Sequence, residues 1–559
     1  MPTDPNSRAR RTAWHPLTLL GVLALWLATA GNLPLWRAVW QLPETHSWHA
    51  LATALNLGLL LLALNLGLLC LLLWPRWRRP LGLLLLLVAA SASYFMHTYG
   101  VVIDASMLRN ATNTDLREVR DLLSGGMLVA LLLGVVLPGW WWWRQPVRAV
   151  PARRLLGQQL GLGGLALLAV LLLGWASFQD LASLVRNHKP LRYMVNPYNS
   201  LYAASRHAAG RATQVQQPLV PIGLDAVRAV PVKADPQQAP LIIFVVGETA
   251  RAANFGLGGY DRDTTPRLRQ LQGQGGLVYY PRTSSCGTNT QDSVPCMFSH
   301  LGRETFEASN TRFENVLDVL QRAGLAVLWL DNQSGCKGVC ERVPSVDTRS
   351  LAVPGLCEGD ECLDEAMLRE LPARLAALEP ERRARGTVVV LHQMGSHGPA
   401  YHKRSPAAYK AFLPECGKAA LQDCPREHIV NAYDNSIRYT DHLLAETVQW
   451  LQAQQRPTAL LYVSDHGESL GEKGLYLHGM PYRMAPQAQT HVPMLLWLSA
   501  TMRQRLGLDM ACLRETADRP VSHDHLFHTL LDLAEVRTSL RNPRLDLLDA
   551  CSPQNRPQG

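Results

Sequence analysis

The chain has 559 residues and a formal net charge of +9 at neutral pH. This length allows more than one domain. Ten arginines beside the apolar segments described below, less Asp4, account for that whole net charge, so the rest of the chain is close to neutral. The positive charge is not spread over a basic surface, and this argues against a nucleic-acid-binding protein.

Five segments in the first third of the chain are nearly free of charge and rich in Leu, Ala, Val and Trp. They cover residues 16–36, 50–74, 80–100, 124–143 and 155–178. Each has about 20 residues, enough for a helix to span the roughly 30 Å hydrocarbon core of a bilayer. Buried core helices are the alternative, but segments that are hydrophobic on all sides favour membrane spans. No small-residue cleavage site follows the first segment, which disfavours a signal peptide.

The arginines predict how these spans are oriented. They lie between residues 8 and 11, between 76 and 79, and between 144 and 154, whereas the first connection, QLPETHSWHA, has none. The positive-inside rule therefore places the N-terminus in the cytoplasm. Five crossings then place everything after about residue 180 on the far side of the membrane.

Cysteine usage agrees with export. Of eleven cysteines, Cys70 lies in an apolar span and the other ten lie beyond residue 280. Eight of these form four close pairs in the sequence: Cys286 with Cys296, Cys336 with Cys340, Cys357 with Cys362, and Cys416 with Cys424. Cys512 and Cys551 remain as a possible fifth pair. Disulfides in an oxidising compartment are favoured over zinc ribbons, because no C-x2-C pair is present.

The chain is predicted to have three parts. Residues 1–180 form a transmembrane domain, residues 181–239 a linker with amphipathic helices at the bilayer surface, and residues 240–559 a catalytic domain. Within the first part, the connection 101–123 predicts a short helix with Asn110, Thr114 and Glu118 on one face. That face is either a solvated polar surface or a patch that contacts a lipid headgroup.

From about residue 240 the pattern is that of an α/β domain. Four apolar runs fit buried parallel strands: LIIFVV (241–246), LAVLWL (325–330), TVVVLHQ (387–393) and TALLYV (458–463). Helical patterns separate them, including 311–323, 363–378 and 429–455. The alternation predicts a mostly parallel sheet covered on both faces, with ligands beyond the carboxyl ends of its strands.

Carboxylates and histidines follow these predicted strands. Glu248 follows the first run, His397 follows the third, and Asp465 and His466 follow the fourth, with His478 soon after. Because parallel strands end at one edge of a sheet, these side chains are expected to meet there. Carboxylate oxygen and imidazole nitrogen suit zinc or a similar divalent ion. Buried ion pairs and helix caps are the alternative.

The segment SSCGTNTQDSVPCMFS (284–299) places two threonines between two cysteines. A threonine hydroxyl is a poor nucleophile unless a base or a metal ion stabilises its alkoxide. A bridge between Cys286 and Cys296 would stiffen this loop. Helix-forming residues follow, so the nucleophile is expected at a helix N-terminus, which favours phosphate oxygens.

Together these motifs resemble those of the lipid A phosphoethanolamine transferases, in the alkaline phosphatase superfamily, which include the mobile colistin-resistance enzymes. The stretches that carry the resemblance are GETARAANFGLGGYDRDTTP, SCGTNTQDSVPCMFS, NQSGCKGVC, QMGSHGPAY, SDHGESLGE and LYLHGMPY. The resemblance covers nearly the whole chain. It implies a five-helix transmembrane domain followed by an α/β alkaline-phosphatase/sulfatase-like catalytic domain with a mostly parallel sheet.

The resemblance also implies roles for individual residues. Thr290 would be the nucleophile, and zinc would be held by Glu248, Thr290, Asp465 and His466. His397 and His478 would bind the phosphoryl group or a second zinc ion and transfer protons, and the substrate-contacting residues would be Lys337, Asn110, Thr114 and Glu118. One departure is Gln333, where the family often has asparagine. Thr288 is interpreted as shaping the loop and His392 as a core histidine.

The implied function is zinc-dependent transfer of phosphoethanolamine from phosphatidylethanolamine to a lipid A phosphate, through a covalent intermediate on the threonine, which would lower the affinity for polymyxins such as colistin. Alternatives are transfer to core oligosaccharide or periplasmic glucan, a phosphodiesterase, and a non-catalytic membrane sensor. A sulfatase is disfavoured because no C-x-P-x-R signature occurs. The expected location is the bacterial inner membrane with a periplasmic catalytic domain, as a monomer in contact with membrane lipids.

Overall fold

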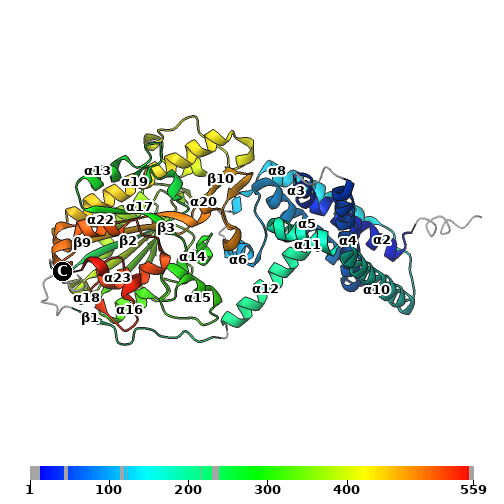
Figure 1. Cartoon of the computed structure of the whole chain (residues 1–559), viewed down its shortest axis with the longest axis horizontal. Coiled ribbons are helices and arrows are strands. Elements are labelled where there is room, and N and C mark those ends of the chain that lie inside the picture. Colours follow the sequence, from blue (N-terminus) through cyan, green and yellow to red (C-terminus); the bar gives the residue numbers. More distant parts are fainter. Residues whose placement is uncertain are drawn as a thin grey trace, which may run out of the picture. The chain divides into compact units, whose positions relative to one another are not determined.

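The computed structural model describes residues 13–42, 48–113, 119–120, 122–215, 217–229, 238–359 and 361–552. The chain divides into two compact units (Figure 1). The first comprises Met1–Leu108 and Leu123–Ala208, and the second comprises Arg109–Leu122 and Ala209–Gly559. The boundary after Ala208 lies inside the segment 181–239 that the sequence predicts to be a linker.

Among the described residues, five helices are long and apolar enough to cross a membrane, as predicted. They cover Pro16–Trp40, Leu51–Leu72, Arg78–Tyr99, Gly125–Arg144 and Ala152–Ala176. The helical elements that form them are α2 (Pro16–Ala28), η1 (Ala30–Asn32), α3 (Leu33–Trp40), α4 (Trp48–Leu72), α5 (Arg78–Tyr99), α8 (Gly125–Leu131), η3 (Leu132–Val136), α9 (Leu137–Arg144) and α10 (Ala152–Ala176). Many of their leucines are exposed, as expected where lipid is the solvent.

Shorter helices accompany the spans. They are α6 (Ala105–Asn113) in the connection between the third and fourth spans, and α11 (Phe178–Asn187), η4 (Lys189–Tyr193) and α12 (Tyr198–Val215) after the last span. Leu184, Leu191 and Met194 pack against an apolar cluster built by α3 and α4. The segment after the fifth span is therefore anchored to the first unit through its apolar side chains.

The second unit is built on an eight-stranded sheet with the strand order β13-β3-β12-β9-β2-β8-β4-β5. The strands are β2 (Leu241–Gly247), β3 (Leu277–Ser284), β4 (Ala326–Asp331), β5 (Ser345–Asp347), β8 (Thr387–His392), β9 (Thr458–Ser464), β12 (His491–Leu498) and β13 (Val521–Ser522). The four predicted strands β2, β4, β8 and β9 are neighbours and parallel. β12 runs antiparallel to both β3 and β9. The prediction of a mostly parallel sheet is confirmed, and β3, β5, β12 and β13 extend it beyond the four predicted strands.

Helices cover both faces of this sheet, as Figure 1 shows. One face packs against α14 (Thr290–Met297), α16 (Val316–Arg322), α21 (Ala500–Leu506), α22 (Met510–Thr516) and α23 (Leu526–Leu533). The other packs against α13 (Pro266–Gly273), α17 (Glu365–Ala376) and α19 (Arg426–Gln452). Along β2 the side chains alternate between the two cores, with Phe244 in one and Val245 in the other. A strand buried on both faces needs a continuous apolar run, which explains why β2 could be predicted.

All five cysteine pairs that the sequence suggested are disulfides. Cys286 is bonded to Cys296, Cys336 to Cys340, Cys357 to Cys362, Cys416 to Cys424, and Cys512 to Cys551. Their sulfur atoms are therefore not available as zinc ligands, and the zinc-ribbon alternative is excluded. Cys70, in the first unit, is a buried free thiol. The confinement of the disulfides to the second unit agrees with an oxidising environment for that unit.

Candidate active site

Three buried side chains meet where β2 and β9 end. Gly247 pairs with Ser464 in the parallel register, so the residues that follow these strands emerge side by side. Glu248, Asp465 and His466 each offer a ligand atom, and these atoms lie within 4.8 Å of one another. The three side chains are fully buried. The structure thus brings together two carboxylates and one imidazole from segments more than 200 residues apart in the sequence.

Thr290 lies against this cluster. It is the first residue of α14, and the side chain of Asn289 caps that helix by accepting a hydrogen bond from the backbone N–H of Asp292 at 3.0 Å. The Thr290 hydroxyl donates to Oε2 of Glu248 at 3.1 Å and lies 3.4 Å from Nε2 of His466. The hydroxyl is therefore directed at the cluster from a helix N-terminus, where partial positive charge favours anions.

The other threonine of this loop has a different role. The Thr288 hydroxyl donates to the carbonyl oxygen of Met480 at 2.7 Å, and the N–H of Gly479 donates to the carbonyl oxygen of Thr288 at 2.8 Å. These bonds tie the loop to the segment that follows His478. Thr288 shapes the loop, in agreement with its interpretation from the sequence.

The side chains of this cluster shift one another's pKa values. Burial would raise the pKa of Glu248, but the hydrogen bond and charge of His466 outweigh it and hold that pKa well below its ordinary value. Burial and the charge of Glu248 raise the pKa of Asp465. Burial disfavours the charged form of His466, yet the neighbouring carboxylates raise its pKa well above the ordinary value. The two carboxylates therefore require a cationic partner at this position.

A divalent cation fits these groups. Nδ1 of His466 lies 2.9 Å from the carbonyl oxygen of Gly467, which can only accept, so Nδ1 carries the hydrogen and Nε2 faces Thr290 as a potential ligand. Oδ2 of Asp465 is buried and accepts no hydrogen bond from the described residues. An oxygen-rich set with one imidazole nitrogen is a donor set that zinc accepts.

A second histidine is oriented by a carboxylate. Nδ1 of His478 lies 2.8 Å from Oε2 of Glu468, and the Tyr401 hydroxyl donates to the other oxygen of that carboxylate. The rings of His466 and His478 have their centres 4.3 Å apart, and that of His397 lies 5.8 Å from His478. Burial and the charge of His466 lower the pKa of His478. Sequence reasoning left the role of Glu468 open; its place two residues after His466 is the signal that could have found it.

The remaining predicted residues fall into two groups. A hollow over Thr290 is lined by Gln333, Ser334, Lys337, His397 and His478, and also by Asn110 and Asn113 from α6, whose residues from Arg109 onward group with the second unit. Thr114 and Glu118 lie outside the described residues. The substitution noted from the sequence has a visible consequence, because Nε2 of Gln333 donates to Oε2 of Glu248 at 3.1 Å.

His392 is separate from this hollow. It lies within β8, fully buried, and its Nδ1 is 3.0 Å from Oδ2 of Asp331. The same carboxylate oxygen accepts the indole N–H of Trp329 at 2.8 Å. These contacts agree with the interpretation of His392 as a core histidine.

The chain is similar to known proteins in both of its units. A family model described as phosphoethanolamine transferase EptA/EptB matches residues 60–212, and a sulfatase family model matches residues 240–536. The chain is 38% identical over 554 residues to phosphoethanolamine transferase EptA of Escherichia coli K12, covering 97% of this chain and 98% of the relative. It is 39% identical to phosphatidylethanolamine transferase Mcr-1 of Escherichia coli, over 82% of this chain and 84% of the relative.

A solved structure shows the same architecture. The integral membrane lipooligosaccharide phosphoethanolamine transferase A (EptA) of Neisseria meningitidis matches with a TM-score of 0.90 and 33% identity, covering 96% of this chain and 98% of that one. The chain belongs to the EptA family of phosphoethanolamine transferases. It is thus an enzyme of this transferase class, and the family predicted from its motifs is confirmed.

In this EptA-family enzyme, part of the strained backbone lies beside the site. Three non-glycine residues adopt positive φ beside it: Thr249 (60°), Lys337 (51°) and Leu477 (62°). Each such conformation costs about 1–3 kcal/mol and persists only where the surroundings impose it. Gly395, at φ 50°, has the space for its missing Cβ taken by the carbonyl oxygen of Glu248, 2.7 Å away. The loops after β2 and β4 are therefore held in place at an energetic cost, whereas Gly395 lets the loop after β8 approach Glu248 closely.

Proposed function

We propose that this enzyme transfers phosphoethanolamine from phosphatidylethanolamine to a phosphate of lipid A, with Thr290 as the nucleophile. The observation that carries the proposal is the Thr290 hydroxyl, placed 3.1 Å from Glu248 at a helix N-terminus within a buried set of oxygen and nitrogen ligands. A zinc ion held by Glu248, Thr290, Asp465 and His466 would favour the threonine alkoxide and offset negative charge on the phosphoryl oxygens.

The chain's own residues supply the rest of the first step. The Thr290 hydroxyl gives up its proton to water, and its oxygen forms a bond to the donor phosphorus while the bond from phosphorus to the diacylglycerol oxygen breaks. The diacylglycerol oxygen takes a proton as it leaves. His478 is suited to donate it, because the contact of its Nδ1 with Glu468 orients the ring with Nε2 toward the hollow.

The second step regenerates the enzyme. An oxygen of a lipid A phosphate forms a bond to the phosphorus of the phosphoethanolamine-threonine intermediate, and the bond to Thr290 breaks. The threonine oxygen leaves as the alkoxide and recovers a proton from water. Lys337, whose ammonium donates to the Ser334 hydroxyl oxygen at 2.7 Å in the same hollow, would stabilise the phosphoryl oxygens in both steps.

The membrane unit supports this function by keeping the enzyme at the surface where both lipids reside. With the arginines on the cytoplasmic side, the second unit would lie in the periplasm of a Gram-negative cell. Addition of a cationic amine to lipid A would reduce the binding of cationic peptides such as polymyxin. The enzyme would act as a monomer, with one tightly bound zinc ion and with His397 and His478 available to a second.

Mass spectrometry of lipid A from cells that express the enzyme tests the proposal. The wild type should add one phosphoethanolamine group and raise polymyxin resistance, Thr290→Ala should do neither, and Thr290→Ser should retain part of the activity. Thr288→Ser is the matched control on the same loop and should modify lipid A. Labelled donor that reaches core oligosaccharide, glucan or only water, instead of lipid A, would contradict the proposed acceptor.

A further inference from the structure

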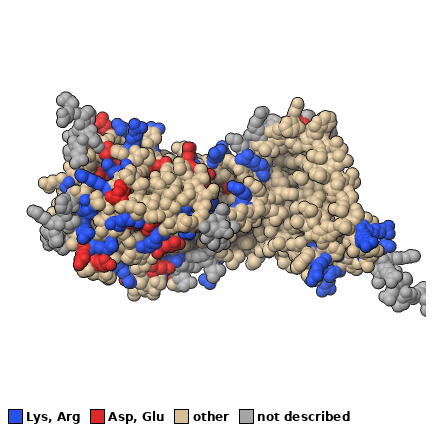
Figure 2. All heavy atoms as spheres, turned by 90° about the horizontal axis from the view of Figure 1, so that it is seen from below, with Lys and Arg blue, Asp and Glu red and all other residues tan. Residues whose placement is uncertain are grey.

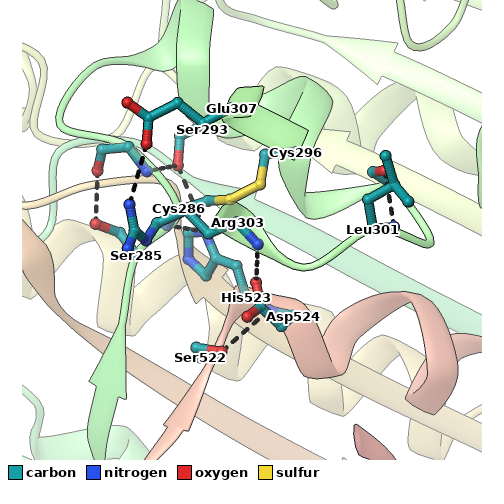
Figure 3. The surroundings of a disulfide bond; sticks show 12 residues. Ser285, Cys286, Ser293, Cys296, Leu301, Arg303, Glu307, Ser522, His523 and Asp524 are labelled. Carbon is teal, nitrogen blue, oxygen red and sulfur yellow. Dashed lines mark hydrogen bonds and ion pairs between the residues drawn. A yellow bond between two sulfur atoms is a disulfide. The ribbon is translucent and has the colours of Figure 1, made fainter. Parts of the chain in front are cut away.

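A second hollow lies beside the nucleophile loop, and the proposed mechanism does not use it. It has a volume of about 460 Å³, within the range of about 300–1,000 Å³ that ligand sites occupy. Its walls come from the end of β3, from α15 (Arg303–Ala308), from Tyr482 and from the segment that follows β13. Figure 3 labels four of its lining residues, Ser285, Arg303, Ser522 and Asp524, in the surroundings of the Cys286–Cys296 disulfide. We call it the hydroxyl groove.

The hydroxyl groove and the hollow over Thr290 are formed by the same two segments of chain. Ser285 lines the groove, and Thr290 lines the other hollow, five residues later. In the same way Tyr482 lines the groove and His478 lines the other hollow. The Tyr482 hydroxyl donates to the carbonyl oxygen of Ser285 at 2.9 Å and joins the two segments. The two hollows are therefore bounded by neighbouring parts of the same two segments, four and five residues apart in the chain.

The groove lining contains both hydrogen-bond donors and hydrogen-bond acceptors. The guanidinium of Arg303 lies 4.2 Å from the centre of the Tyr482 ring and pairs with Glu307 at 3.3 Å. Its backbone N–H donates to Oδ1 of Asp524 at 2.9 Å, which fixes that carboxylate at the groove wall (Figure 3). Ser522 and Thr305 add hydroxyl groups to the lining.

This lining selects one class of ligand. Sugar hydroxyls both donate and accept hydrogen bonds. The hydroxyls, carboxylate and guanidinium of the groove can accept the hydrogen bonds that a sugar donates and donate those that it accepts. Lipid tails would need an apolar lining, and the lone guanidinium among acidic neighbours does not suit a polyanion. A cation site is also disfavoured, because the two sulfur atoms near Asp524 are joined in a disulfide and are not thiolate ligands.

We propose that the hydroxyl groove binds a sugar ring of the acceptor, so that the phosphate on that sugar is directed toward Thr290. The proposal rests on the proposed function and adds to it a place for the acceptor that is separate from the hollow where the donor phosphorus reacts. Donor loading of the threonine would then be independent of the groove, and transfer to the acceptor would depend on it.

The experiment compares the two half-reactions in full-length enzyme reconstituted in nanodiscs. Thr305→Trp fills the groove from an exposed position of α15, and Ala308→Trp, exposed on the same helix but outside the groove lining, is the matched control.

Diacylglycerol release from phosphatidylethanolamine without acceptor reports loading, and transfer to lipid A reports the second step. Thr305→Trp should raise the KM for lipid A by about tenfold or more, while loading stays within about twofold. Ala308→Trp should match the wild type in both.

A binding measurement tests the groove without turnover. Glucosamine 1-phosphate, as a soluble probe, should bind to the wild-type enzyme and to Ala308→Trp by saturation-transfer NMR, and its signal should be lost with Thr305→Trp. Undiminished probe binding and lipid A transfer in Thr305→Trp would overturn the groove proposal, and so would an equal loss in both half-reactions. Absence of loading in the wild type would instead count against the proposed function, and the probe would still decide the groove.

Discussion

The two units of this enzyme achieve burial in opposite ways. In the second unit all seven residues of β2 are buried between two layers of helices. In the first unit α10 buries few residues, and Leu160, Leu165 and Leu171 are each more than 60% exposed. Figure 2 shows the same contrast in charge, because Lys, Arg, Asp and Glu cover the visible face of the second unit and most of the first is without them. The first unit depends on lipid to cover its apolar surface, whereas the second carries its own core.

The units also differ in what they do with buried polar groups. In the first unit Asn32 and Asn196 are buried and satisfy each other, because the Asn32 amide donates to the Asn196 carbonyl oxygen at 2.7 Å and accepts its N–H at 2.8 Å. In the second unit Glu248, Asp465 and His466 are buried ionisable groups. Neutral amides can be satisfied by hydrogen bonds alone, but clustered carboxylates need a cation. The comparison therefore favours the second unit as the place of the proposed chemistry.

The largest expected effect comes from breaking that charged cluster. Asp465→Asn removes one carboxylate from the cluster, so we expect zinc content to fall and transfer to drop by about 10³-fold or more. Inductively coupled plasma mass spectrometry and lipid A analysis measure the two. Asn65→Leu, at a fully buried polar position of the first unit, is the control and should leave transfer within about twofold. Equal losses in the two variants would contradict the contrast between the units.

The carboxylate behind His478 should have the next largest effect. Glu468→Gln keeps the size of the side chain but removes the charge that raises the pKa of His478, so the protonated histidine becomes rarer. We expect transfer to fall by about 10–100-fold. The alkaline limb of the pH–rate profile should move to lower pH, because the proton donor is lost earlier. An unchanged limb would show that His478 does not donate the proton. Tyr401→Phe removes a hydrogen-bond donor from Glu468 and leaves its charge less neutralised, so it should move the limb slightly to higher pH.

Cysteine variants compare how the two units are stabilised. Cys512 and Cys551 are 39 residues apart in the sequence, and opening a loop of that size costs about 4 kcal/mol in the free energy of unfolding. Cys512→Ser with Cys551→Ser should therefore lower the unfolding midpoint in urea. Cys70→Ala, in the first unit, should cost about 1 kcal/mol or less, because it removes one buried sulfur from a helix interface. A smaller loss from the double variant than from Cys70→Ala would refute this order.

The smallest expected effect is a pH dependence of the second unit. Burial lowers the pKa of His528 to about 4 in the folded enzyme, against about 6.5 in the unfolded chain. Between these values the unfolded state binds more protons, so stability falls as the pH drops from about 6.5 to 4, by at most about 1.4 kcal/mol per pH unit. His528→Asn, whose amide oxygen can still accept the N–H of Asn542, should flatten that part of the stability–pH curve. A curve as steep as that of the wild type would exclude His528 as its source.

Much of the architecture was accessible from local sequence. The membrane spans are uninterrupted apolar segments of about 20 residues, and β2, β4, β8 and β9 are apolar on both faces. β3 and β12 were not assigned, because β3 reads LVYYPRTS with Pro281 and Arg282 in its second half, and β12 contains Pro493. Their pairing depends on each other and on β9, which no local pattern reports.

The candidate site also has features that the sequence predicts and features that only the tertiary structure shows. Short sequence motifs predict the residue types after each strand and the threonine loop between two cysteines. Strand direction alone then brings the residues after the strands to one edge of the sheet. The contacts of Gln333 with Glu248, of Glu468 with His478, and of Arg303 with Asp524 in the hydroxyl groove join loops that are 10 to 221 residues apart in the chain. Periodicity and composition describe neighbours along the chain, whereas a hydrogen bond between distant loops exists only once packing has set their positions. For this enzyme the amino-acid sequence is therefore sufficient to predict the spans, the central strands and the types of reactive group. The tertiary structure decides how those groups are oriented and where a second ligand can bind.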